Sequence, residues 1–267
     1  MQKLQLGCGT TLLLLASIPT TAMADTDAPS PWGGSTSIYY SQNGYGKDDY
    51  RSIRSINWTA TAKYKISDNY SGYLTGGGYR AYEDKTGDFF TDSVLGVSRS
   101  SLYSFGETGN IGASLQFTIP TSETSKNDDL KTAARLGLSV SGQAAGFNLS
   151  IAPRYRKNFH QYKTTVNGKV LVEHLVSVVS SVGYGIGDAY LSGSIIGGTS
   201  WTYSGNRRDW TYVGQLSASY KFTDSFSGAL SASNSGVYFD AEQGTLGNID
   251  LFDEKSATYT ATLTYSF

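Results

Sequence analysis

The stretch SATYTATLTYSF, residues 256–267, reads as a β-strand with two different faces. Its apolar and aromatic side chains alternate strictly with hydroxyl side chains. Successive side chains of a strand point to opposite sides of the sheet, so this segment has one apolar face and one polar face. The apolar face carries Ala257, Tyr259, Ala261, Leu263, Tyr265 and Phe267, and the polar face carries Thr258, Thr260, Thr262, Thr264 and Ser266.

The same alternation recurs along the chain in segments of about ten residues, a length that suits a tilted membrane-spanning strand and exceeds the usual globular strand. The clearest segments are residues 55–66, 110–119, 147–156 and 210–222. Weaker but compatible segments are residues 34–42, 70–79, 93–103, 131–141, 172–182, 189–199 and 226–236. With the last segment the sequence predicts twelve strands, an even number, as an up-and-down bacterial barrel requires.

The connections between these strands alternate in length, which is an independent signal. Short turns are predicted at residues 67–69, 104–109, 142–146, 183–188 and 223–225. Longer polar connections are predicted at residues 43–54, 80–92, 120–130, 157–171, 200–209 and 237–255. Such alternation is typical of periplasmic turns and extracellular loops. The sequence therefore predicts an all-β protein, a transmembrane up-and-down antiparallel β-barrel over residues 34–267. A soluble β-sandwich, the competing fold, would have shorter and less evenly alternating strands.

The amino-terminal residues 1–24 have the features of a secretory signal peptide: Lys3, an apolar core around Leu12 and Leu15, and the triplet Ala22-Met23-Ala24. Cleavage is expected before Asp25. Residues 25–33 then form a short periplasmic segment, and the mature protein is expected in the outer membrane of a Gram-negative cell.

Composition excludes several functions. The single cysteine, Cys8, lies in the predicted signal peptide, so the mature chain has no disulfide framework and no thiolate metal site. Without Lys3, 20 basic residues face 22 acidic ones, so net charge gives no reason to expect a nucleic-acid partner. No metal-ligand spacing or cofactor motif is present.

Acidic and basic residues occupy different parts of the predicted barrel. Nearly all of the acidic residues lie in turns and connections, and only Glu173 lies clearly within a strand. A cation at the lipid midplane costs about 2–4 kcal/mol, so strand-borne cations are expected on the inner face. Arg99 is ambiguous because its strand alternates poorly. The six that fall on the polar face are Lys63, Lys65, Arg135, Arg154, Arg156 and Lys221.

A basic lumen favours anions, which makes an anion-preferring channel the main hypothesis. The competing interpretation is that these side chains pair with loop carboxylates or fill the interior. Barrels of eight strands are filled by side chains and those of sixteen hold an open channel, so twelve lies between the two.

Catalysis is not predicted. The only histidines are His160 and His174, beside the 157–171 connection, and neither lies in a recognisable lipase or deacylase signature. The sequence therefore predicts no catalytic residues.

A terminal strand that ends on Phe267 resembles the recognition signal of Gram-negative outer-membrane barrels, which implies an interaction with the barrel-assembly machinery. In outline the chain resembles the small twelve-stranded channels, most nearly the oligogalacturonate- and sialic-acid-specific porin family. That resemblance implies passive diffusion of small anionic solutes, including acidic saccharides, along the six inner cations, with outer-membrane lipid and lipopolysaccharide as surroundings. The alternative is a non-conducting barrel that partners a surface-polymer export or electron-transfer complex.

Overall fold

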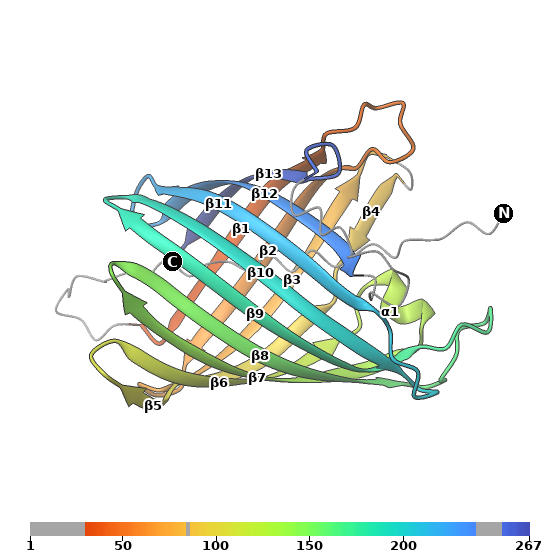
Figure 1. The fold of residues 1–267 in the computed structure, drawn as a ribbon, viewed down its shortest axis with the longest axis horizontal. Coiled ribbons are helices and arrows are strands. Elements are labelled where there is room, and N and C mark those ends of the chain that lie inside the picture. The colour runs from red at the N-terminus through yellow and green to blue at the C-terminus, as the bar shows by residue number, and fades with distance from the viewer. Residues whose placement is uncertain (1–29, 84–85, 239–252) are drawn as a thin grey trace.

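The structure, a computed structural model, describes residues 30–83, 86–238 and 253–267. The predicted signal peptide and most of the 25–33 segment lie outside these residues. Thirteen strands form one antiparallel sheet, and one short helix lies between two of them (Figure 1). The elements are β1 Trp32–Asn43, β2 Arg54–Lys65, β3 Tyr70–Ala81, β4 Gly87–Phe90, β5 Ser93–Phe105, β6 Gly109–Ile119, α1 Glu123–Asn127, β7 Leu130–Ala144, β8 Phe147–His160, β9 Val172–Ile186, β10 Ala189–Thr202, β11 Trp210–Lys221, β12 Phe226–Tyr238 and β13 Thr258–Ser266.

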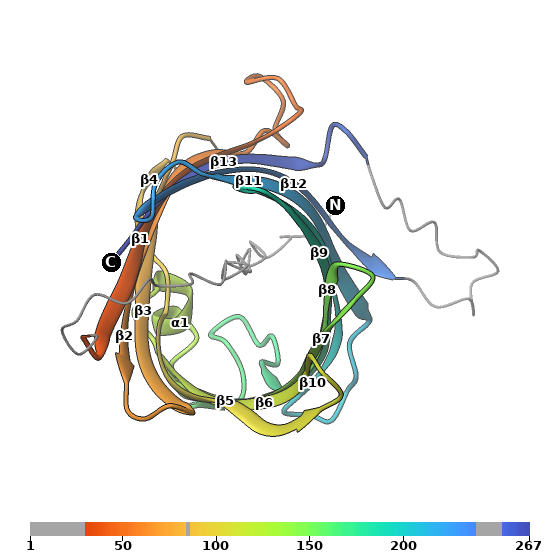
Figure 2. The same cartoon turned by 90° about the vertical axis from the view of Figure 1, so that its left-hand side faces the viewer.

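The sheet closes on itself into a cylinder. β1 pairs with both β2 and β13, and β2 pairs with β3, so the barrel has no free edge (Figure 2). Twelve of the strands form the wall, and β4 pairs only with the end of β3. The predicted twelve-stranded antiparallel barrel is confirmed, and each of the twelve predicted strands is present.

The wall has an apolar outer face and a polar inner face. Leu216, Leu230 and Leu263 lie on the convex outer face, where side chains splay apart, and they are 66%, 67% and 63% exposed. On the concave inner face hydroxyl groups bond across strand pairs: Ser37 Oγ lies 2.8 Å from Thr264 Oγ1, and Ser41 Oγ lies 2.9 Å from Thr260 Oγ1. The threonine row of β13 therefore faces the lumen.

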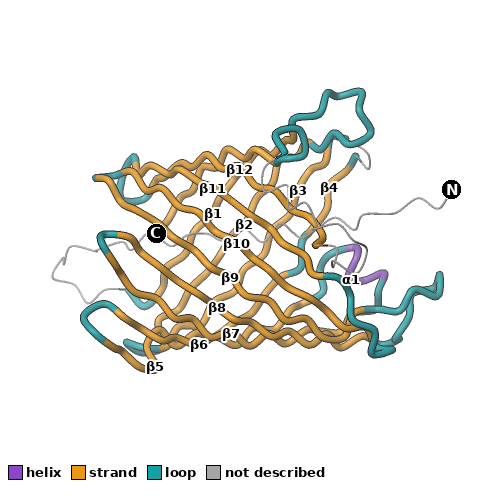
Figure 3. Tube along the Cα trace, in the orientation of Figure 1, coloured by secondary structure: helices purple, strands orange, loops and turns teal. Residues whose placement is uncertain are grey.

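The two ends of the barrel differ (Figure 3). Short turns and Phe267 lie at one end, and the longer connections and α1 lie at the other. Aromatic rings pack across neighbouring strands at the short-turn end, as an aromatic girdle requires. The pairs are Trp32 with Tyr64, Phe147 with Tyr184, and Phe226 with Tyr265, with ring centroids 4.8, 5.0 and 4.9 Å apart.

The first and last strands are joined through a glycine. Gly34 N donates to Phe267 O at 3.0 Å, and Phe267 N donates to Gly34 O at 3.1 Å. A Cβ atom on Gly34 would lie 2.5 Å from the backbone oxygen of Thr61 and 2.8 Å from the Phe267 ring. The ring of Phe267 therefore occupies space that any side chain at position 34 would need.

Three local features differ from the sequence prediction. β4 and α1 lie within the predicted polar connections 80–92 and 120–130, in which the sequence predicts no strand or helix. β4 forms because residues 78–81 of β3 still offer ladder hydrogen bonds beyond the barrel wall. Two turns are shorter than predicted, since strands continue to Ala144 and Ile186 and leave two-residue turns at 145–146 and 187–188. In the described part of the chain no helix has the length and apolarity needed to cross a membrane.

Candidate functional site

Three arginines gather on one part of the inner wall, and we call Arg135, Arg154 and Arg156 the arginine cluster. Arg135 on β7 lies directly opposite Arg156 on β8, and Arg154 lies opposite Gly137. Arg154 and Arg156 are two positions apart on one strand, so both side chains point to the same face. The Cγ atom of Arg154 lies 3.7 Å from where a Cβ of Gly137 would be, so its stem is close to the bare backbone of β7.

The turn between β7 and β8 fixes this register. Ala145 and Gly146 have φ values of 50° and 82°. Positive φ at both central residues defines the two-residue hairpin turn whose twist matches that of the strands. The turn pairs Ala144 with Phe147. The same register continues along the two strands and pairs Arg135 with Arg156. The sequence therefore places two like charges side by side through a turn ten residues away.

Neutral side chains hold two of the guanidinium groups. Arg135 Nη1 donates to Gln116 Oε1 at 3.3 Å, and Gln116 Nε2 donates to the phenolic oxygen of Tyr73. The Tyr73 ring reaches β6 across Gly96, where a Cβ atom would collide with it. Arg156 Nε donates to Asn158 Oδ1 at 2.8 Å. Among the described residues, no carboxylate oxygen lies within 4.0 Å of a cluster nitrogen.

The three predicted lysines lie elsewhere, at the short-turn end of the barrel. Lys65 Nζ lies 2.9 Å from Asp68 Oδ1, and Lys221 Nζ lies 2.6 Å from Asp224 Oδ1. These hydrogen bonds lower the pKa of the Asp68 and Asp224 carboxyls. Lys63 lies two residues before the end of β2, opposite Tyr73. The six predicted cations therefore form two groups. Two of the three lysines form ion pairs with turn carboxylates, and among the described residues the three arginines form none.

Arg99, whose face the sequence left open, points outward. It follows the outward-facing Leu95 and Val97 at alternate positions, and its guanidinium lies 5.3 Å from the Tyr70 ring centroid and donates to the Tyr70 hydroxyl at 3.2 Å. Its strand alternates poorly because the β5–β6 register shifts between Arg99 and Tyr103.

Sequence reasoning did not identify Tyr73, Gln116 or Asn158. Gln116 lies in the predicted strand 110–119, but alternation within one strand does not identify the neighbour of a side chain on the next strand. Only the β6–β7 register puts Gln116 opposite Arg135.

The mouth at the long-connection end is narrowed by α1, which lies inside the ring of strands in the view along the barrel (Figure 2). Asp92 holds this segment in place. Its Oδ1 accepts from Ser122 N at 3.0 Å, and its Oδ2 accepts from Ser125 Oγ at 2.5 Å. Ser122 also caps the helix by accepting from Ser125 N. One carboxylate therefore anchors the α1 segment to the barrel wall.

Replacing Asp92 by asparagine is expected to loosen the α1 segment, because hydrogen bonds to a charged group each contribute about 1.5–3 kcal/mol. Limited trypsin digestion should then cut after the exposed Lys126 about tenfold faster or more, relative to cleavage after Lys163 in another connection. Asp88→Asn is the matched control, since Asp88 pairs with Arg80 at 2.6 Å in the β3–β4 hairpin. Equal cleavage after Lys126 in both variants would contradict the anchoring role.

The two histidines bond to tyrosines. His174 Nδ1 lies 2.7 Å from the Tyr155 hydroxyl, and His160 Nδ1 lies 3.2 Å from the Tyr203 hydroxyl. No cluster of three or more potential metal ligands occurs within residues 30–83, 86–238 and 253–267. That the protein is not an enzyme stays a prediction.

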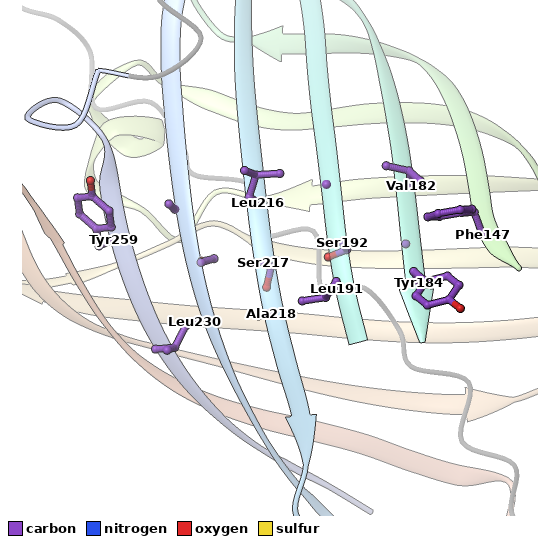
Figure 4. A pocket seen from close by; sticks show the side chains of 14 residues that line it. Phe147, Val182, Tyr184, Leu191, Ser192, Leu216, Ser217, Ala218, Leu230 and Tyr259 are labelled. Atoms are coloured by element: carbon purple, nitrogen blue, oxygen red, sulfur yellow. The ribbon is translucent and has the colours of Figure 1, made fainter. Parts of the chain in front are cut away.

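A shallow apolar depression of about 680 Å³ lies on the outer wall, away from the arginine cluster (Figure 4). Leu191, Leu216 and Leu230 from three neighbouring strands border it, and small residues such as Gly193 and Ala218 leave it open. Its apolar lining continues the outer face of the barrel.

No protein-family model and no curated protein matches the chain. Solved structures do. An outer-membrane channel from Pseudomonas putida F1 is 11% identical with a TM-score of 0.60, and the match covers 92% of this chain and 100% of that one. A NanC porin is 11% identical with a TM-score of 0.57, covering 87% of this chain and 98% of that one. The chain therefore shares the fold of small outer-membrane channels.

Proposed function

We propose that this protein is an outer-membrane channel whose lumen favours small anionic solutes, including acidic saccharides. The arginine cluster carries this proposal. A passage through a low-dielectric wall strengthens the field of fixed charges on a passing ion. Three guanidinium groups that form no ion pair among the described residues therefore favour anions.

The surroundings follow from the two faces of the wall. In this proposal the apolar outer face contacts lipid and lipopolysaccharide. The signal peptide is cleaved before Asp25, and the short-turn end of the barrel faces the periplasm. The short turns support this orientation, since periplasmic turns of such barrels are short and extracellular loops are longer. Recognition of Phe267 by the barrel-assembly machinery is part of the same proposal.

Acidic saccharides are included because pairs of hydroxyl groups lie on other parts of the inner wall. Besides the β1–β13 pairs, Ser150 Oγ lies 2.7 Å from Ser181 Oγ, and Thr61 Oγ1 lies 2.9 Å from Thr75 Oγ1. A hydroxyl group both donates and accepts hydrogen bonds, so such rows suit a polyhydroxylated solute. A carboxylate on that solute would meet the guanidinium groups.

Planar-bilayer recording tests the proposal. Purified protein in a KCl gradient is expected to give discrete conductance steps. The reversal potential is expected to lie closer to the equilibrium potential of chloride than to that of potassium. Recordings without steps, or with potassium preference, would reject it.

The position of α1 in the mouth favours the second candidate, a non-conducting barrel that partners a surface-polymer export or electron-transfer complex. Co-purification from native membranes separates the two. A stable partner together with the absence of conductance supports the second candidate, and a solitary conducting barrel rejects it.

A further inference from the structure

We infer that the arginine cluster is a single saturable site for a compact multivalent oxyanion, one that carries at least two negative charges within a few ångströms. This inference rests on the proposed function, because it assumes that solutes reach the lumen. It differs from a continuous cationic track, in which weak sites follow one another from one mouth to the other.

The spacing of the three side chains suits one ligand. Arg135 and Arg156 are directly opposed across one strand pair, so their Cβ atoms are about 5 Å apart. Arg154 and Arg156 lie about 7 Å apart along β8. Three flexible side chains with these origins can all reach the oxygens of a single phosphate- or polycarboxylate-sized anion.

Most donors of the cluster have no partner among the described residues. A guanidinium has five N–H donors. Arg135 uses one toward Gln116, Arg156 uses one toward Asn158, and Arg154 has no side-chain hydrogen bond in the described part of the chain. Oxyanions accept two parallel hydrogen bonds from such a group on two separate oxygen atoms, whereas chloride offers a single acceptor atom. The unused donors therefore favour an oxyanion over a simple halide.

The cluster is also costly without a ligand. Like charges directly opposite each other on a sheet destabilise it. Among the described residues no carboxylate forms an ion pair with the cluster, and Asp92 is the one carboxylate whose field acts on it, at Arg156. One negative charge does not balance three positive ones. The partners that are present, Gln116 and Asn158, orient the guanidinium groups without reducing their charge. An anion with two or more charges supplies the compensation that these neutral partners do not.

The rest of the cationic set does not extend the site. Lys65 and Lys221 are paired with turn carboxylates at the far end of the barrel, and Arg99 points outward. Lys63 lies on β2, four strand spacings from β7 and therefore about 19 Å from Arg135 along the sheet. A multivalent anion that passes through the lumen therefore meets one concentrated group of charges.

The experiment is block of chloride current through single barrels by pyrophosphate and, separately, by citrate. We expect saturable, concentration-dependent block. Arg154→Gln should raise the half-blocking concentration about tenfold, as expected for loss of one charge-assisted contact. Block by both probes assigns the site to compact polyanions in general, and block by one alone assigns it to phosphoryl or to polycarboxylate groups.

Arg99→Gln is the matched control, because it removes the same charge from the outer wall and should change the half-blocking concentration less than about twofold. Chloride-selective current that neither probe blocks would overturn this inference and leave the proposed function intact. If the barrel does not conduct, the proposed function fails. Calorimetric titration of pyrophosphate and of citrate into detergent-solubilised protein then decides the site, with no saturable heat for either probe overturning it.

Discussion

Replacing Arg135, Arg154 and Arg156 together by glutamine is expected to abolish the preference of the channel for chloride over potassium. An ion about 7 Å from one guanidinium gains about 0.6 kcal/mol at the dielectric of water and about 2.4 kcal/mol at an effective dielectric constant of about 20. Three such charges outweigh any other fixed charge described on that part of the wall. The permeability ratio from reversal potentials should fall at least about tenfold, since about 1.4 kcal/mol corresponds to a factor of ten.

The same triple variant is expected to fold as stably as the natural protein or more so. It removes the opposed like charges of Arg135 and Arg156, a repulsion that costs up to about 1 kcal/mol. Urea titration in detergent micelles measures this directly. Arg99→Gln, which removes a charge outside the lumen, should leave the permeability ratio unchanged. Loss of selectivity in that control, or a triple variant less stable by more than about 2 kcal/mol, would argue that the arginines serve packing.

Replacing Gly34 by valine is expected to prevent normal closure of the barrel. A Cβ atom at this position meets both the Thr61 backbone oxygen and the Phe267 ring, and a backbone oxygen cannot move aside without disturbing the β1–β2 ladder. Overpacking of this kind costs about 3 kcal/mol or more. Folded barrels migrate faster in denaturing gels when the sample is not heated. The variant should lose most of this fast-migrating, heat-modifiable band.

Gly214→Val is the matched control for this experiment. Gly214 also lies in a strand, but no atom lies within 4 Å of a Cβ built there, so valine should be tolerated within about 1 kcal/mol. Combining Gly34→Val with Phe267→Ala removes the ring contact and leaves the Thr61 contact, so only partial recovery is expected. Full recovery would show that the ring alone, and not the backbone, sets the requirement for glycine.

The barrel itself could be predicted from the sequence because each strand carries its own evidence. The alternation in residues 256–267 determines which side chains face inward without reference to any other strand, and the lengths of the connections determine which ends lie together. The turns were predicted less well. Gly142 is typical of a turn, but Gly142, Gln143 and Ala144 all pair within the β7–β8 ladder.

The candidate site was only half predictable for a related reason. Alternation shows that Arg135 and Arg156 face the lumen, but their level along the barrel depends on the register, and the register depends on the left-handed backbone at Ala145. The same limitation hid the difference between the arginines and the lysines. Pairing of Lys65 with Asp68 needs the turn geometry, and pairing of Gln116 with Arg135 needs a neighbouring strand.

The contact between β1 and β13 also has a consequence for biogenesis. Ser37 of β1 and Thr264 of β13 are 227 positions apart in the chain, so β1 lacks its second neighbour until β13 has been synthesised. An unpaired edge of this kind readily joins other chains, and pairing between such distant segments is slow. Closure of the barrel is therefore expected to limit its folding rate, and the unclosed barrel is expected to be the species most prone to aggregate.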